Sequence, residues 1–300
     1  MDLINKIYQG DCIQVMNDMP EKCIDLIVTD PPYLISYKTN HRKDKSHEFT
    51  SEIANDNNPE LITNYIKMCH TIMKDNTAMY MFCSADKVDF FKQELEKYFK
   101  IKNMIIWVKN NWSAGDLEGA FGRQYEICFL VNKGRKKFNG KRITDVWQFD
   151  RVVGNNQVHQ NQKPVELIRQ CIEKHSQSGD LVFDGFGGSG TTALAALELG
   201  RNYLTVEFEE KYCKIIHKRV NSAKPIEKVV FNTNEIENIW EGRIKEIDKP
   251  IEPPFSRILL NGVVSSNENK IMSQICQICN STYEGSYEEH EKRPFHQGYI

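Results

Sequence analysis

The chain has 300 residues, of which 40% are hydrophobic and 27% are charged, and its formal net charge is −2. This composition is that of an ordinary globular protein with a sizeable core, and the charge excludes a globally basic coat for nucleic acid. An enzyme that acts on nucleic acid is not excluded, because such an enzyme needs only a local basic face.

Two further features bear on where the protein works. No apolar stretch approaches the roughly 20 residues that span a bilayer, and Met1-Asp2 does not open a signal-like run. The nine cysteines are odd in number and mostly lie singly between Cys12 and Cys213, which is typical of a reduced chain. We therefore expect a cytoplasmic protein.

The first motif follows the first clear strand. Gly10-Asp11-Cys12 opens a predicted helix to about residue 19, and the apolar, β-branched stretch 24–29 predicts a buried strand that runs into Asp30-Pro31-Pro32-Tyr33. Proline lacks an N–H and forces the residue before it into an extended conformation, so Asp30 should be held at the carboxyl edge of a sheet. Open α/β folds bind ligands at that edge. Taken alone, the motif is equally compatible with a turn that carries an incidental acid.

A long polar loop, residues 34–58, comes directly after this motif. Loops of this length in compact domains are usually functional or mobile. Its basic residues include Lys38, Arg42 and Lys43, which are compatible either with phosphate contacts or with a solvated surface.

The middle of the chain alternates between helical and strand patterns. We predict helices over 61–72 and 86–99, and strands over 77–82, 101–108 and 125–131. A basic segment containing Arg135, Lys136 and Lys137 then lies near Phe138 and Trp147. Basic residues interleaved with aromatic ones suit nucleic acid, although a surface hairpin explains them nearly as well.

The last third repeats the alternation around a glycine-rich turn. A helix is predicted over 164–174, a strand over 181–183, a helix over 191–199, a strand over 203–206 that ends at Glu207, and a helix to about 220. Strands that alternate with helices predict an α/β protein with a mostly parallel, doubly wound sheet.

The glycine-rich turn itself, Gly185-x-Gly187-x-x-Gly190, satisfies the dinucleotide-binding pattern, and Glu207 is placed to accept hydrogen bonds from a ribose. The pattern predicts a nucleoside-bearing cofactor and leaves NAD, FAD and S-adenosylmethionine open, with a ligand-free turn as the alternative. The chain has no G-x-x-x-x-G-K-[ST] string, so a nucleotide-hydrolysing P-loop is not expected.

The two motifs together resemble the DNA amino-methyltransferases that use S-adenosylmethionine. The resemblance rests on Asp30-Pro31-Pro32-Tyr33 and on Phe183-Asp184-Gly185-Phe186-Gly187-Gly188-Ser189-Gly190-Thr191-Thr192, whose order is that of the circularly permuted beta group. It covers about residues 3–220 and implies the Rossmann-like methyltransferase fold. The family usually has proline where this chain has Gly185, and H-P-T-x-K-P where it has His159-Gln160-Asn161-Gln162-Lys163-Pro164. The first departure should cost little, and the second leaves Lys163-Pro164 in place.

The resemblance also implies roles for individual residues. Asp30 and the Pro31 carbonyl would each accept one N–H of an exocyclic base amine, Pro32 would stiffen the turn, and Tyr33 would stack on a base flipped out of the duplex. The cofactor pocket would be lined by Asp11, Lys163, Asp184, Phe186, Gly188, Ser189, Gly190, Thr191 and Glu207.

The expected activity is therefore methylation of adenine N6 in double-stranded DNA by a prokaryotic or phage-encoded enzyme. Cytosine N4 stays open because either amine would fit the same acceptors, whereas the thiolate route to cytosine carbon is not expected because no Pro-Cys dipeptide occurs. A homodimer and a cognate restriction endonuclease are further family expectations. The DNA-facing loops would be 34–58 and 132–158, with contacts from Lys38, Arg42, Lys43, Arg135, Lys136 and Lys137.

Three readings from other classes remain. A nicotinamide-dependent oxidoreductase would explain the glycine-rich turn but leaves Asp30-Pro31-Pro32-Tyr33 without a role. An amide methyltransferase would typically carry Asn in place of Asp30. A non-catalytic DNA-binding module would keep DNA affinity without methyl transfer.

The domain organisation predicted from composition has three parts. A catalytic domain covers 1–222, a proline-containing linker or extension covers 223–265, and a polar tail covers 266–300. In the tail, Cys276-x-x-Cys279 followed by His290 and His296 could hold a structural zinc ion. The alternative is a disordered or accessory tail.

Overall fold

The computed structural model describes residues 1–35, 56–112, 118–154, 157–159 and 161–223, together with the backbone of two short strands, β9 (Gln274–Ile275) and β10 (Thr282–Tyr283). The chain divides into two compact units, Met1–Val229 and Val230–Ile300. In the second unit β9 and β10 pair antiparallel.

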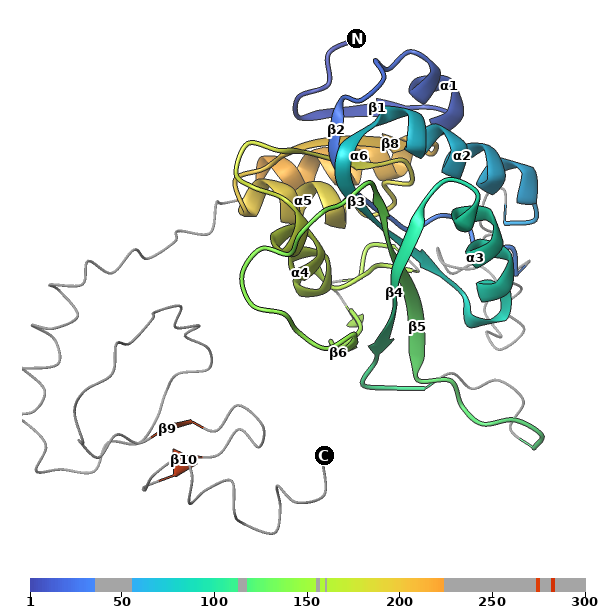
Figure 1. The fold of residues 1–300 in the computed structure, drawn as a ribbon, viewed down its shortest axis with the longest axis vertical. Coiled ribbons are helices and arrows are strands. Elements are labelled where there is room, and N and C mark those ends of the chain that lie inside the picture. The colour runs from blue at the N-terminus through green and yellow to red at the C-terminus, as the bar shows by residue number, and fades with distance from the viewer. Residues whose placement is uncertain are drawn as a thin grey trace, which may run out of the picture. The chain divides into compact units, whose positions relative to one another are not determined.

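The first unit is built on one eight-stranded sheet in the order β1-β8-β7-β2-β3-β5-β4-β6 (Figure 1). Strand β5 runs antiparallel to its neighbours β3 and β4, and the other pairs are parallel, so the predicted mostly parallel sheet is confirmed. The strands are β1 (Lys6–Gln9), β2 (Ile24–Thr29), β3 (Met73–Cys83), β4 (Lys100–Val108), β5 (Tyr125–Lys133), β6 (Val146–Gln148), β7 (Leu181–Asp184) and β8 (Asn202–Glu207).

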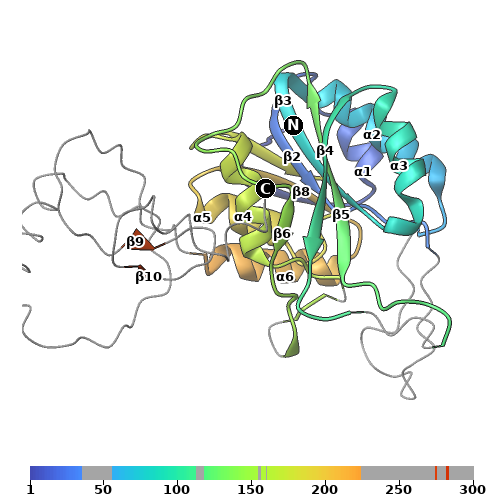
Figure 2. The same ribbon diagram turned by 60° about the horizontal axis from the view of Figure 1, so that its bottom comes forward.

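Helices cover both faces of this sheet (Figure 2). One face packs against α1, α2 and α3, and the other packs against α4, α5 and α6, which produces two separate hydrophobic cores. This is the doubly wound arrangement that the alternating pattern predicts. The helices are α1 (Cys12–Asn17), α2 (Pro59–Ile72), α3 (Val88–Glu96), α4 (Val165–His175), α5 (Thr191–Glu198) and α6 (Glu210–Asn221).

Side-chain caps fix where the first two helices begin. The Asp11 carboxylate accepts hydrogen bonds from the backbone N–H groups of Ile13 at 2.8 Å and Gln14 at 3.2 Å. Asn58 accepts from the backbone N–H of Leu61 at 3.1 Å, and Pro59 occupies the first helical turn. These contacts satisfy N–H groups that a helix start leaves without partners.

The structure differs from the predicted elements in four places, one of which is the unpredicted strand β1. The predicted helix 86–99 is shorter, because a 3₁₀ turn (Ala85–Lys87) precedes α3. Strand β3 begins four residues earlier than its core pattern suggests, in the exposed polar residues after Met73. Strand β6 has only three residues and was not predicted. Within the described ranges, no helix is long and apolar enough to cross a bilayer.

Strand β5 runs from the carboxyl edge of the sheet, where the parallel strands end, to the amino edge, where they begin, because it is antiparallel to β3. Its first residues pair with the end of β3, where Ile127 lies opposite Cys83, and its last residue, Lys133, lies opposite Thr77. The side chain of Glu126 is thereby brought to the carboxyl edge, where β2 also ends. The segment after Lys133 starts from the opposite, amino edge.

Candidate active site

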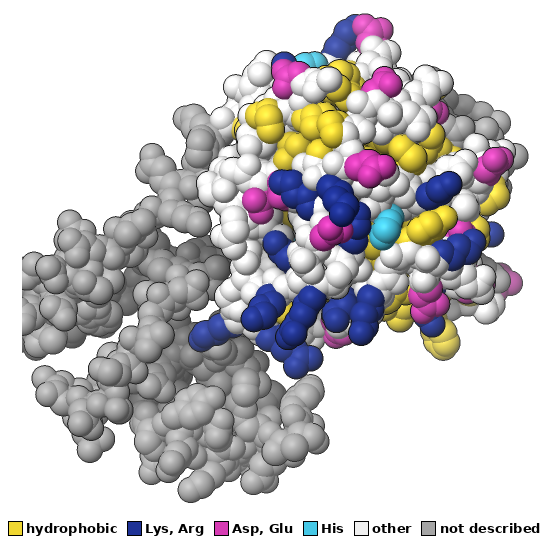
Figure 3. All heavy atoms as spheres, turned by 45° about the horizontal axis from the view of Figure 1, so that its top comes forward, with side chains coloured by type: hydrophobic (Ala, Val, Ile, Leu, Met, Phe, Trp, Pro, Cys, Tyr) yellow, Lys and Arg dark blue, Asp and Glu magenta, His cyan; other side chains and the backbone are white. Residues whose placement is uncertain are grey.

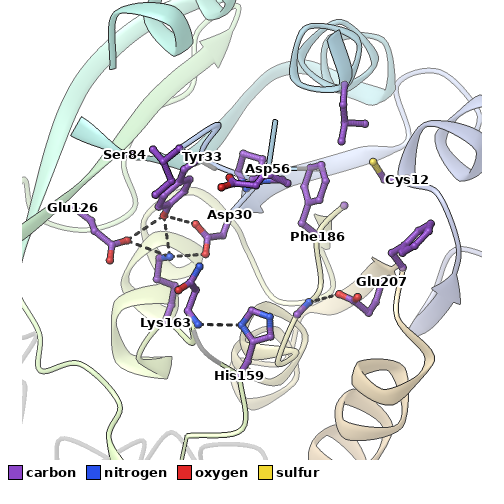
Figure 4. Close-up of a pocket in the computed structure, with 18 of the residues that line it drawn as sticks. Cys12, Asp30, Tyr33, Asp56, Ser84, Glu126, His159, Lys163, Phe186 and Glu207 are labelled. Carbon is purple, nitrogen blue, oxygen red and sulfur yellow. Dashed lines mark hydrogen bonds and ion pairs between the residues drawn. The ribbon is translucent and has the colours of Figure 1, made fainter. Parts of the chain in front are cut away.

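A cavity of about 410 Å³ opens at the carboxyl edge of the sheet (Figure 4). The turn after β2 forms one end, where Asp30, Pro31 and Tyr33 line the wall. The loops after β7 and β8 form the other end, with Phe186, Gly188 and Glu207. The two motifs that the sequence separates by about 150 residues therefore face one space.

Five side chains make a bonded cluster at the Asp30 end, and four of them are labelled in Figure 4. The Lys163 ammonium lies 2.5 Å from Oδ2 of Asp30, 3.0 Å from the hydroxyl oxygen of Tyr33 and 3.2 Å from Oε2 of Glu126. The Tyr33 hydroxyl donates to Oδ1 of Asp30 at 2.5 Å. Lys109 completes the set by donating to Oε1 of Glu126 at 3.0 Å. Two carboxylates thus face two ammonium groups.

These contacts govern the ionisation of the cluster. Burial would lower the Lys163 pKa, but the carboxylates of Asp30 and Glu126 outweigh it and hold that pKa above its ordinary value. Burial would raise the Glu126 pKa, yet the ammonium groups of Lys163 and Lys109 lower it to about 2. Burial raises the Asp30 pKa, and Lys163 opposes this rise without cancelling it. Glu126 and Lys163 are therefore both charged at neutral pH.

The local sequence explains how these groups meet. Asp30 follows the buried strand β2 and precedes two prolines, and Lys163 immediately precedes Pro164, the residue that caps α4. Glu126 is the second residue of β5. Lys163 is only 6% exposed, so its charge is removed from solvent and depends on its partners.

The opposite end of the cavity carries the glycine-rich turn. Glu207 accepts hydrogen bonds from the backbone N–H of Gly188 at 2.6 Å and of Glu209 at 2.8 Å, one on each carboxylate oxygen. Each oxygen keeps a second acceptor position, which two ribose hydroxyls could use. With the Phe186 ring on the same wall, this end has the carboxylate, backbone and aromatic groups that suit a nucleoside-bearing cofactor.

The structure gives a reason for glycine at 185. Tyr65 of α2 occupies the space beside it, and a Cβ atom at this position would lie 2.4 Å from Cε2 of Tyr65. The Gly185 N–H donates to the Tyr65 hydroxyl at 3.2 Å, and this hydroxyl lies 2.9 Å from Oγ1 of Thr29. Proline would remove that N–H and collide with the ring.

The other predicted cofactor residues divide into two groups. Asp11, Lys163, Phe186, Gly188 and Glu207 line the cavity. Four others are buried or lie in the turn behind its wall: Asp184, Ser189, Gly190 and Thr191.

Asp184 is one of these buried residues, and its hydrogen bonds hold the turn after β7 in shape. Its Oδ1 accepts from the hydroxyl of Thr29 and from the backbone N–H of Phe186, both at 3.1 Å. Burial raises the pKa of Asp184 to about 7.

The structure places only some of the residues that were predicted to contact DNA. Lys38, Arg42 and Lys43 lie outside the described residues. The segment with Arg135, Lys136 and Lys137 leaves β5 at the amino edge, where the Arg135 N–H donates to Asn76 at 2.9 Å. Lys and Arg side chains do gather on part of the face drawn in Figure 3, so the net charge of −2 conceals local positive surface.

Sequence reasoning missed Glu126, Lys109 and the loop between β4 and β5. Glu126 is a charged residue in an otherwise apolar strand, which was the available signal, but its position depends on the direction of β5. The loop is closed by a hydrogen bond from the Lys109 N–H to the Gln124 carbonyl at 2.8 Å. It exposes Trp112 and Phe121, which are 67% and 103% exposed.

The metal ligands predicted in the tail, Cys276, Cys279, His290 and His296, lie outside the part of the chain that is described.

Comparisons with known proteins agree with this geometry. The family model described as DNA methylase (N6/N4 methyltransferases) matches residues 24–218. The chain is 29% identical over 328 residues to the Type II methyltransferase M.HinfI of Haemophilus influenzae, covering 97% of this chain and 86% of that protein. It is 27% identical over 252 residues to the DNA adenine methyltransferase YhdJ of Escherichia coli strain K12, covering 72% and 83%.

Solved structures give the same result at the level of the fold. The crystal structure of an M1.HpyAVI–SAM complex superposes with a TM-score of 0.55 at 25% identity, covering 72% of this chain and 99% of that one. The cytosine-N4-specific PvuII DNA methyltransferase superposes with a TM-score of 0.58 at 16% identity, covering 81% and 93%. The second likeness concerns the fold alone.

Proposed function

The chain belongs to the N6/N4 DNA methylase family, and from this membership we propose that it transfers a methyl group from S-adenosylmethionine to the N6 amine of an adenine flipped out of double-stranded DNA. The observation that carries the proposal is the shared cavity. A carboxylate on a proline-stiffened turn and a glycine-rich turn beside Glu207 face the same space.

The Asp30 end supplies what an amine acceptor needs. An exocyclic base amine is a poor nucleophile because its lone pair is delocalised into the ring. The Asp30 carboxylate and the Pro31 carbonyl each accept one amine N–H, which favours a pyramidal nitrogen with its lone pair directed at the methyl group. The new C–N bond forms as the C–S bond breaks, and Asp30 is the adjacent acceptor for the proton that the nitrogen then releases.

The other end supplies what the methyl donor needs. S-adenosylmethionine, when bound, provides an electrophilic methyl group on a sulfonium. Glu207 accepts from its ribose hydroxyls, Phe186 and Gly188 line the nucleoside site, and Asp11 contacts it from the start of α1. The M1.HpyAVI complex with this ligand supports the assignment, because 72% of this chain aligns with 99% of that protein.

Adenine is the proposed base and cytosine N4 is the second candidate. The similarity to a DNA adenine methyltransferase supports adenine, and the shared fold of a cytosine-N4 enzyme keeps the second candidate open. The similarity to M.HinfI, a Type II methyltransferase, supports a role in restriction–modification beside a cognate endonuclease. The proposal also includes a homodimer, zinc bound in the tail, and domain boundaries at residues 222 and 265. Measuring the zinc stoichiometry of the purified protein tests for the metal.

The direct test is product analysis. Purified protein is incubated with S-adenosylmethionine and unmethylated DNA of varied sequence, and the DNA is digested to nucleosides for mass spectrometry. We expect N6-methyladenine from the wild type and none from Asp30→Ala. The matched control is Asp75→Ala. Asp75 is an exposed carboxylate at the amino edge, where it pairs with Lys22 and Lys133, and its loss should leave the product yield unchanged.

The other outcomes are equally informative. N4-methylcytosine would overturn the base assignment and retain the mechanism. Absence of both products, from folded protein shown by calorimetry to bind S-adenosylmethionine, would contradict the proposed substrate.

A further inference from the structure

We propose that the Lys163 ammonium donates a hydrogen bond to the ring nitrogen beside the amine being methylated, so that Asp30 and Lys163 together read the Watson–Crick edge of the flipped base. The inference rests on the proposed function and deepens it. It assigns Lys163 to the base, whereas its position in the sequence motif suggested the cofactor.

The position of the Lys163 ammonium is the first observation. Its nitrogen is bonded at the Asp30 end of the cavity, at 2.5 Å from Oδ2 of Asp30 (Figure 4). An acceptor and a donor therefore stand side by side at the place where the target amine must lie. Both side chains line the cavity, so a ligand in it reaches both.

The Watson–Crick edge of adenine has the complementary pattern. Its N6 amine is a donor and the neighbouring N1 is an acceptor, and enzymes that flip a base read this edge with hydrogen bonds. When Asp30 accepts from the amine, the nitrogen of Lys163 is the adjacent protein atom and faces N1. Cytosine presents the same pattern with its N4 amine and N3.

Hydrogen-bond capacity allows this contact with one exchange. An ammonium has three N–H donors, and those of Lys163 are directed at Asp30, Glu126 and the Tyr33 hydroxyl. The hydroxyl contact is the only one of the three without a charged acceptor, and the hydroxyl still donates to Asp30 when it is released. The ring nitrogen then replaces it.

Glu126 is the positioning residue in this arrangement. It bonds Lys163 on one carboxylate oxygen and Lys109 on the other, and it accepts from the Tyr33 hydroxyl at 3.1 Å. It holds the Lys163 chain in place when the base enters and balances the charge of a buried ammonium.

The pair also rejects the other two bases. Guanine and thymine carry a carbonyl oxygen and a ring N–H at the corresponding positions. The oxygen would face the Asp30 carboxylate and the N–H would face the Lys163 ammonium, which places acceptor against acceptor and donor against donor. Asp30 and Lys163 thus select amino-bearing bases, and the choice between adenine and cytosine is made elsewhere in the cavity.

The test replaces single ring atoms of the substrate. Duplexes carry the methylation site found in the product analysis, with adenine, 1-deazaadenine or 3-deazaadenine at the target position. For the wild type we expect 1-deazaadenine to lower kcat/KM about 10-fold more than 3-deazaadenine, in which the lost nitrogen lies off the Watson–Crick edge. Equal penalties for the two analogues would overturn the inference, and this comparison needs no variant. If the product is N4-methylcytosine, 3-deazacytosine is the corresponding probe.

Variants then identify the donor. In Lys163→Met the extra penalty of 1-deazaadenine should disappear, while Lys109→Met, which removes an ammonium from the same cluster, should retain it in full. A Lys163→Met enzyme that keeps the whole extra penalty, or whose only defect is a raised Kd for S-adenosylmethionine, would contradict the assignment. Failure of the wild type to methylate ordinary DNA would instead refute the proposed function, so the two failures are distinguishable.

Discussion

The side chains that meet at Asp30 form a charge-balanced cluster, so changing one member changes the ionisation of the others. Burial would lower the pKa of Lys163, but Asp30 and, after it, Glu126 raise that pKa and keep the ammonium charged.

We predict that Glu126→Gln lowers kcat about 10-fold, because one hydrogen bond to a charged group is weakened. Removing this carboxylate also lowers the pKa of Lys163, so the ammonium is lost, and kcat declines, at a lower alkaline pH than in the wild type. Methyl-transfer rates measured against pH test both points, with the Kd for S-adenosylmethionine as the control that should stay within about twofold. An unchanged alkaline limb would refute the predicted coupling.

Asp184 leads to a prediction about stability. Its pKa is raised to about 7 in the folded protein, so between about pH 4 and pH 7 the folded state binds more protons than the unfolded state. The contribution of Asp184 to the free energy of unfolding is therefore present below this window and declines as pH rises through it, by at most about 1.4 kcal/mol per pH unit. Asp184→Asn should remove this decline, because an amide does not ionise in this range. The Oδ1 atom of the asparagine can still accept the hydrogen bonds from Thr29 and Phe186.

Urea unfolding of the wild type and Asp184→Asn at several pH values from 4 to 8 measures the difference. A difference that does not vary with pH would show that Asp184 ionises normally.

Among individual site residues, the sequence predicts those that end parallel strands. Asp30 and Glu207 follow β-branched stretches, and parallel strands place their ends at one edge whatever their order. Glu126 could not be found in this way, because its side chain reaches the same edge only since β5 runs in the opposite direction. The direction of a strand is a property of the assembled sheet.

Among the elements, the turn after β7 depends on a helix far away in sequence. Tyr65 of α2 fills the space that a side chain at 185 would need and accepts the N–H of Gly185. The family's usual proline is therefore excluded by this chain's own α2. The replacement of proline by Gly185, which the motif comparison predicts to cost little, is therefore coupled to the large buried side chain of Tyr65.

We predict that Gly185→Pro lowers the free energy of unfolding by about 3 kcal/mol or more, through overpacking and loss of a buried hydrogen bond. Combining it with Tyr65→Ala should recover part of this loss, since the ring that proline meets is gone. Urea unfolding of the two single variants and the double variant gives the coupling. Strictly additive losses would refute the steric explanation.

The loop between β4 and β5 leads to a prediction about DNA. It leaves the sheet at the carboxyl edge, where Lys109, Arg123 and Tyr125 line the cavity, and it exposes Phe121 completely. Proteins that unstack a base often insert an apolar side chain into the opened step. We predict that Phe121→Ala weakens DNA binding about 10-fold, in keeping with the worth of aromatic–base stacking.

The control is Phe138→Ala, which removes another exposed phenylalanine, in the basic segment that leaves from the amino edge. Fluorescence anisotropy with a labelled duplex should show little change for it. A larger effect from Phe138 than from Phe121 would instead support the DNA contact predicted for Arg135, Lys136 and Lys137.

Most elements could be predicted because their apolar periodicity is strong, as in Ile24–Thr29 and Pro59–Ile72. Strand β6 could not, because a three-residue strand has no periodicity. It is held by its neighbour instead: the indole N–H of Trp107 donates to the carbonyl of Phe149 at 2.8 Å. Short edge strands of this kind are specified by tertiary contacts.

At the level of the whole molecule, two relatives match different lengths of this chain. Nearly the whole of M1.HpyAVI corresponds to 72% of this chain, whereas the alignment with M.HinfI continues over 97% of it. Among the residues that the structure describes, both hydrophobic cores lie in the first unit. We therefore expect the first unit to suffice for cofactor binding.

We predict that a chain shortened to residues 1–229 keeps its thermal midpoint within about 4 °C, which corresponds to a change of roughly 1 kcal/mol in stability, and keeps its affinity for S-adenosylmethionine. Calorimetry of the full and shortened chains tests this. Loss of cofactor binding on shortening would show that the second unit supports the site. A site preference on DNA that changes while cofactor binding persists would assign target selection to Val230–Ile300.

The pairing of the first strand with the last strand of the sheet affects how the protein is made. Strand β1 lies against β8, and Asn5 accepts a hydrogen bond from the backbone of Tyr203, 198 residues further on. At translation rates of about 5 to 20 residues per second, the ribosome needs roughly 10 to 40 s to produce the partner of β1. Throughout that interval the nascent chain carries an unpaired strand, and Glu207, the last residue of β8, has not been synthesised. The cavity at the carboxyl edge therefore lacks part of its wall until β8, the last strand of this sheet in chain order, has been made.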